Sequence, residues 1–251
     1  MRLYKTQFGS QVYGTVTPTS DIDIGVVTLE SPLHIYGLKD VKDFPQIVKD
    51  GVDTREFWLK RFLLLCTRGN PNVLEYLYTP ESHVEYCHPI FREHILENAF
   101  IFMNFDKCIQ SHLGFAKSQI MKMRNFNDKL SDRENEVGAK RRALIAQHGY
   151  DTKYASHAIR LIYQLTDILE HGTIRLPYEG AVCDELLAIK LGEISIHEFD
   201  KLYADRVAKV ENVIRLSRDH IDSIKPNHKV IASVLEAVYK LGWADENFQS
   251  N

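Results

Sequence analysis

The printed sequence contains no stretch with the pattern of a membrane span or of a secretory signal. No apolar run among its 251 residues approaches the ~20 residues that a transmembrane helix needs. The opening stretch MRLYKTQFGS carries basic residues but none of the apolar centre of a secretory signal. We therefore expect a cytoplasmic protein without a membrane partner.

Cysteine is scarce, and neither sign of charge is in excess. The four cysteines form no CxxC pair, which excludes a disulfide scaffold and the standard zinc patterns. The formal net charge is −3, and internal repeats and low-complexity tracts are absent. With 44% hydrophobic residues, the composition is typical of a folded globular chain of one large or two small domains.

The hydrophobic pattern changes along the chain. Alternating and β-branched residues predict strands at 2–8 and 22–29, with 33–37 as a hairpin partner, and a helix at 54–68. After Pro89 the apolar spacing is helical throughout. We expect an α+β fold in which a mixed sheet with helices, residues 1–85, precedes a helical domain, residues 86–251.

Two short motifs in the first domain suggest phosphoryl-transfer chemistry. Asp21 and Asp23 alternate onto one face of a strand, about 7 Å apart at a rise of ~3.3 Å per residue. Their mutual repulsion favours a cation between them, and oxygen ligands favour Mg²⁺ or Mn²⁺. Gly9-Ser10 follows the first strand, where backbone amides and a hydroxyl can hold phosphate. Each motif alone is common in solvated edges and turns, so the pattern is informative only in combination.

The stretch GSQVYGTVTPTSDIDIGVV resembles the signature of the DNA polymerase β nucleotidyltransferase superfamily, which adds Ser20 to the nucleotide-binding candidates. The blocks WLKRFLLLCTRGNPNVLEYLYTP, HGYDTKYASHAIRL and LEHGTIRLP resemble predicted nucleotidyltransferases associated with bacterial RNA repair. The resemblance implies two Mg²⁺ or Mn²⁺ ions per site, held by Asp21, Asp23 and a third carboxylate.

Asp53 is the candidate for that third carboxylate, and its spacing allows a second interpretation. Asp53 and Glu56 have the spacing of a capping box at the start of the expected helix. The resemblance instead places a metal ligand here, with Asp50 as the substitute if the register differs.

A polar stripe follows one side of the helix expected at 151–171. Lys153, His157, Arg160 and Gln164 recur at helical spacing, opposite apolar residues. The stripe is either a solvated face or, as the resemblance suggests, a nucleotide-binding face formed by Lys153, His157 and Arg160. Residues 117–148 carry eight Lys or Arg against four acids, which suits either a solvated helix or contact with nucleic acid.

These features predict a nucleotidyltransferase that moves a nucleoside monophosphate from an NTP to an acceptor hydroxyl, with RNA or tRNA as one possible acceptor. Two alternatives remain open. One is a non-catalytic nucleotide- or RNA-binding protein on the same fold, and the other is a transferase that modifies a protein or a small molecule. The sequence does not choose the acceptor, the base or the oligomeric state.

Overall fold

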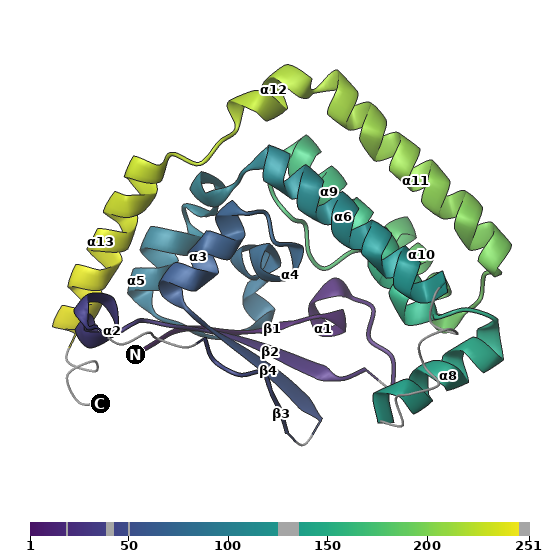
Figure 1. Ribbon diagram of the computed structural model, residues 1–251, viewed down its shortest axis with the longest axis horizontal. Coiled ribbons are helices and arrows are strands. Elements are labelled where there is room, and N and C mark those ends of the chain that lie inside the picture. Colours follow the sequence, from purple (N-terminus) through teal and green to yellow (C-terminus); the bar gives the residue numbers. More distant parts are fainter. Residues whose placement is uncertain (19, 39–42, 50, 125–135, 246–251) are drawn as a thin grey trace.

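The computed structural model describes residues 1–18, 20–38, 43–49, 51–124 and 136–245, and for 136–141 only the backbone. A small sheet lies along one side of the molecule, with helices gathered above it, and the long helices α11 and α13 form the outer boundary of the view (Figure 1). No helix in these ranges combines the length and apolar character needed to cross a membrane.

One mixed sheet, of five strands within the described ranges, has the order β3-β4-β2-β1-β5. β2 pairs with β1 antiparallel and with β4 parallel. The strands are β1 Arg2–Phe8, β2 Ile22–Thr28, β3 Ile47–Lys49, β4 Val52–Trp58 and β5 Val84–Cys87.

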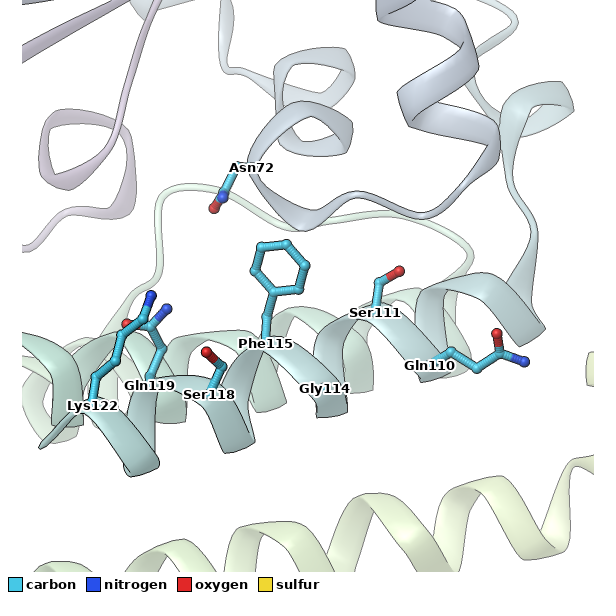
Figure 2. Close-up of a pocket in the computed structure, with 8 residues that line it drawn as sticks. All are labelled: Asn72, Gln110, Ser111, Gly114, Phe115, Ser118, Gln119 and Lys122. Atoms are coloured by element: carbon cyan, nitrogen blue, oxygen red, sulfur yellow. The ribbon is translucent and has the colours of Figure 1, made fainter. Parts of the chain in front are cut away.

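The helices connect these strands and then form the rest of the chain. Those of the first part are α1 Ser10–Tyr13, α2 Pro32–Tyr36, α3 Leu59–Thr67, α4 Pro71–Leu74, η1 Glu75–Tyr78, η2 Glu81–His83, α5 Pro89–Phe91, η3 Arg92–Leu96 and η4 Ala99–Phe102. The later ones are α6 Phe105–Arg124, α8 Glu136–His148, α9 Thr152–His171, α10 Gly180–Leu191, α11 Ile196–Leu216, α12 Arg218–Ser223 and α13 His228–Ala244. The long helices α6 and α9 pack together, and a groove lies between α6 and α4 (Figure 2).

The α+β fold class is confirmed, and so are the strands expected at 2–8 and 22–29. Two local predictions are wrong. Residues 33–37 do not form a strand, because Ser31 caps α2 by accepting the amide of His34, and Pro32 begins that helix. The first third of the helix expected at 54–68 is strand, because Val52–Trp58 pairs along the whole length of β2.

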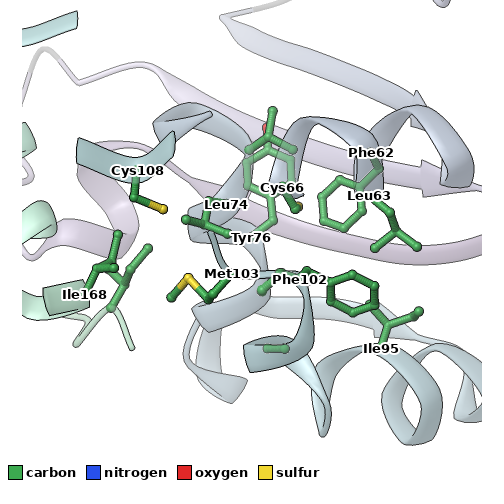
Figure 3. Packing of buried hydrophobic residues seen from close by; sticks show 14 of the residues in the cluster. Phe62, Leu63, Cys66, Leu74, Tyr76, Ile95, Phe102, Met103, Cys108 and Ile168 are labelled. Atoms are coloured by element: carbon green, nitrogen blue, oxygen red, sulfur yellow. The ribbon is translucent and has the colours of Figure 1, made fainter. Parts of the chain in front are cut away.

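The main hydrophobic core joins the sheet to the helices above it (Figure 3). Tyr4 of β1 stacks on Phe91, and Phe62 of α3 stacks on Tyr76. This core continues through α6 and α9 to Val238 of α13, so it includes residues from both of the expected domains. The expected boundary after residue 85 falls within β5.

Candidate functional site

The turn after β1 lies directly against the start of β2. Gly9 has φ +73° and ψ −149°, and a Cβ added to it would come within 2.2 Å of the Asp23 Oδ2 atom. Only glycine suits both the backbone angle and this close approach. The antiparallel pairing of Phe8 with Asp23 therefore brings the Gly9-Ser10 turn and the Asp21-x-Asp23 motif together, although they are separate in the sequence.

Asp23 and Asp53 are direct partners in the parallel register of β2 and β4. Side chains alternate across a strand, so Asp23 shares a face with Gly25, and Asp53 shares one with Phe57. Both Gly25 and Phe57 contact Tyr76, which belongs to the helical side of the sheet. The two carboxylates therefore lie on the sheet face that the helices cover.

The helix-cap interpretation of Asp53 is wrong. The helix that follows β4 is α3, which begins at Leu59, and Asp53 is the second residue of the strand. Asp50, the substitute, lies outside the described residues.

The oxygen atoms of Asp53 are only partly satisfied. Oδ2 accepts a 2.6 Å hydrogen bond from Gln46 and lies 3.5 Å from the Arg55 guanidinium. Oδ1 is buried and has no hydrogen-bond partner among the described atoms. A buried carboxylate oxygen without a partner is costly, and a cation would satisfy it. This oxygen set fits Mg²⁺ or Mn²⁺ chemically, although no three His, Cys, Asp or Glu groups in the described ranges are already gathered as a metal centre.

Burial and the neighbouring Asp53 carboxylate raise the pKa of Asp23 to about 6, while Arg55 and Lys153 oppose the rise. A proton or a bound cation would each relieve the repulsion that causes this shift. The start of β2 is therefore a position at which positive charge is favoured.

Two lysines from the helical part of the chain reach this position. The Lys153 Nζ atom, on the first turn of α9, lies 3.7 Å from Asp21 Oδ2. The Lys190 Nζ atom, near the end of α10, donates to the Thr15 carbonyl at 2.6 Å and to Ser20 Oγ at 3.1 Å. Burial and the charge of Lys153 lower the pKa of Lys190, an effect that Asp21 and Asp23 oppose.

Lys190 is not among the residues predicted from the sequence. It stands alone at the end of an apolar helix, where a cation suits the carbonyl end of any helix. Its position becomes clear only from the packing of α9 against α10, where Thr152 Oγ1 donates to the Lys190 carbonyl at 3.0 Å. The same packing places Lys153 and Lys190 over the connection between α1 and β2.

Ser10 begins α1 and is partly exposed beside Gly9. Ser20 ends the connection to β2, and its Oγ accepts the Thr17 amide at 2.9 Å as well as the Lys190 ammonium. Ser20 thus closes a turn and contacts a cation of the site. His157, one turn after Lys153 on α9, is half-buried.

The prediction that Arg160 faces the nucleotide is wrong. Its side chain is only 4% exposed, forms a 3.1 Å ion pair with Glu75, and lies over the Tyr13 ring at 4.4 Å. Tyr13 donates to Glu75 at 2.8 Å, and Gln164 also contacts the Arg160–Glu75 pair. Lys153, on the first turn of the stripe, reaches the carboxylates, whereas Arg160, two turns further along α9, is buried against α1 and η1.

The buried Tyr13–Glu75–Arg160 network has a structural consequence for the site. Tyr13 is the last residue of α1, so the network fixes the short helix that the Gly9-Ser10 turn begins. Burial raises the pKa of Glu75, while the Arg160 guanidinium and the Tyr13 hydroxyl favour its ionised form.

The basic segment predicted at 117–148 falls partly outside the described residues, which exclude 125–135. Lys117, Lys122 and Arg124 lie exposed on α6. Arg124 is paired with Asp200 at 2.7 Å.

A family model described as "RNA repair pathway DNA polymerase beta family" matches residues 2–237. An uncharacterized 38.9 kDa protein of the nrdC-mobD intergenic region of Enterobacteria phage T4 is 30% identical over 128 residues. That alignment covers 47% of this chain and 37% of the phage protein, so the chain spans well under half of that relative. A nucleotidyltransferase-like protein from Exiguobacterium sibiricum has 13% identity and a TM-score of 0.29, over 86% of this chain and 69% of the other.

Proposed function

Since this chain belongs to the RNA repair pathway DNA polymerase beta family, we propose that it is a metal-dependent nucleotidyltransferase that acts on an RNA end. The observation that carries the proposal is the meeting of three groups at the start of β2. The glycine turn lies against Asp23, Asp53 pairs with Asp23 in register, and Lys153 lies beside Asp21. A phosphate-holding turn next to clustered carboxylates and cations suits the transfer of a phosphoryl group.

The proposed reaction joins the acceptor oxygen to the α-phosphorus of an NTP. The bond between that phosphorus and the bridging oxygen of the β-phosphate breaks, and pyrophosphate leaves. When bound, Mg²⁺ or Mn²⁺ neutralises phosphate charge and increases the acidity of the acceptor hydroxyl. Asp21, Asp23 and Asp53 are the residues that would hold two such ions.

The remaining roles belong to the side chains and amides around these carboxylates. Asp53, whose Oδ1 atom has no described hydrogen-bond partner, would receive the proton of the acceptor hydroxyl. Gly9 and Ser10 would hold the terminal phosphates through backbone amides and a hydroxyl. Lys153 and Lys190 would balance triphosphate charge from the side opposite the sheet, and His157 would contact the nucleotide one turn further along α9.

The position of the label in the product tests this proposal. The protein is incubated with each NTP labelled at the α-phosphorus, with Mg²⁺ or Mn²⁺, and with a pool of RNAs. We expect the label to enter RNA, whereas label at the γ-phosphorus should leave as pyrophosphate. Label that enters only protein or a small molecule would refute the RNA acceptor. If no NTP is consumed under any of these conditions, the chain is a binding protein on this fold.

A further inference from the structure

The groove between α4 and α6 (Figure 2) presents both polar and apolar surface, and no carboxylate among the described residues lines it. Its volume is about 650 Å³, within the ~300–1,000 Å³ that is common for ligand sites. Asn72 of α4 forms one wall, and residues of α6 form the other. The groove is lined by amides, hydroxyls, one aromatic ring and one lysine, although the chain has 34 acidic residues. This lining is suited to a polar, negatively charged occupant.

The α6 wall is one continuous face of the helix. Ser111, Phe115, Gln119 and Lys122 recur at steps of three or four residues. The Phe115 side chain is 37% exposed, and it points from α6 toward α4 in Figure 2. Next to it, a Cβ added to Gly114 would meet nothing within 4 Å, so the space beside the ring is open. An exposed ring in an open groove offers a stacking surface for a planar group.

One end of the groove leads toward the candidate active site. The Lys122 Nζ atom lies 5.9 Å from the centre of the Tyr154 ring, and Tyr154 follows Lys153 on α9. Lys153 in turn lies 3.7 Å from Asp21. The other end of the groove, at Gln110, lies on the side of the groove away from the candidate active site. Gln110 and Lys122 are about 18 Å apart along the helix, at a rise of ~1.5 Å per residue.

We propose that this α4–α6 groove binds the single-stranded RNA segment that ends in the acceptor hydroxyl. The inference rests on the proposed function and identifies where its substrate lies. Phe115 stacks on a base, the amides of Gln119 and Asn72 contact base edges, and Lys122 contacts a phosphate next to the reacting end. About 18 Å accommodates roughly five nucleotides at ~3.4 Å per stacked base. Stacking on an aromatic ring and amide contacts to base edges favour RNA over a peptide.

Direct binding tests the groove independently of catalysis. The probe is a ten-nucleotide oligouridylate with a 5′-fluorescein, titrated with the full chain and followed by fluorescence anisotropy. Phe115→Ala should weaken binding by about fivefold to a hundredfold, since base–aromatic stacking contributes on that scale. Met121→Ala is the matched control, because Met121 is a 54% exposed apolar residue on the same helix that does not line the groove.

A second pair of variants tests the phosphate contact. Lys122→Ala should weaken binding and reduce the salt dependence of log K by about 0.7, the slope for one phosphate of a single strand. Lys117→Ala removes an exposed lysine of α6 outside the groove and should leave that slope unchanged. Circular dichroism of all four variants confirms that they are folded.

The outcomes separate the groove from the proposed function. RNA binding that is lost in Phe115→Ala and Lys122→Ala but kept in both controls supports the groove, even if no NTP is consumed. Absence of oligouridylate binding, or equal binding by groove and control variants, would refute RNA binding in the groove. Neither result bears on nucleotidyl transfer, which the label assay tests separately. Label transfer to a protein acceptor instead of RNA also overturns it.

Discussion

Breaking the buried pair of Arg160 and Glu75 by removing one partner should strongly destabilise the fold. Both side chains are under 5% exposed, and Arg160 also lies over the Tyr13 ring. Arg160→Met keeps much of the volume but leaves the Glu75 carboxylate buried without its counter-ion. Removing one partner of a buried pair costs about 3–5 kcal/mol. For a chain of this size, that corresponds to a fall in Tm of roughly 10 °C.

Urea unfolding followed by circular dichroism measures this loss, and a second variant identifies its cause. The double variant Glu75→Gln/Arg160→Met no longer buries an unpaired charge, so it should recover part of the free energy of unfolding. The control is Arg92→Met, because Arg92 pairs with Glu81 on the surface, where both side chains are more than 40% exposed. That substitution should cost at most about 1 kcal/mol.

Equally small losses of stability in Arg160→Met and Arg92→Met would show that Arg160 is not the buried counter-ion of Glu75. A weakened affinity for NTP together with unchanged unfolding would show that Arg160 leaves the network to contact the nucleotide. Coupling between the substitutions at Glu75 and Arg160 is the signature of the buried pair, because distant sites would be additive within ~0.5 kcal/mol.

Three further predictions follow from the site and the core. Gly9→Ala should preserve the fold by circular dichroism but reduce NTP turnover at least tenfold, since the added Cβ would displace Asp23 Oδ2; near-native turnover would contradict this contact. Lys190→Met should raise the KM for NTP by about tenfold, the scale of one charge-assisted contact, and an unchanged KM in steady-state assays would remove Lys190 from the site. Burial lowers the pKa of His112 to about 4, so its contribution to stability is fully present above pH 6.5, the unfolded value. As the pH falls from 6.5 to 4, the free energy of unfolding should therefore decrease by about 3 kcal/mol. Urea titrations of the wild type and of His112→Gln at several pH values measure this loss. Parallel pH profiles of the free energy of unfolding in the two proteins would contradict it.

The glycine turn and the Asp21-x-Asp23 motif could be found from the sequence because each is a local pattern. The superfamily resemblance implied that the two motifs lie in contact. In the structure, the antiparallel register of β1 and β2 brings them together. Asp53 could not be assigned in the same way, since an aspartate before a helix and an aspartate inside a strand can have identical neighbours. The parallel register with β2, a contact between residues thirty positions apart, decides between them.

The polar face of α9 shows a second limit. Helical spacing places Lys153 and Arg160 on one stripe but does not indicate what covers each turn. Lys153 meets Asp21, whereas Arg160 meets Glu75 from a different element. Glu75 itself, in a short turn rich in apolar residues, gave no sign in the sequence of a buried counter-ion. Long-range partners of buried charges therefore had to come from the tertiary structure.

The most direct test of the proposed activity is the rate of pyrophosphate release with saturating NTP, RNA and Mg²⁺. The comparison is between the wild type and Asp23→Asn, with Asp219→Asn as the control, because Asp219 is an exposed carboxylate on α12. We expect the rate of pyrophosphate release by Asp23→Asn to be lower by on the order of 10³-fold, because a charged ligand of the proposed metal site is lost. Asp219→Asn should match the wild type. Pyrophosphate release at a near-native rate in Asp23→Asn, or equal release by the wild type with and without a chelator, would contradict the account.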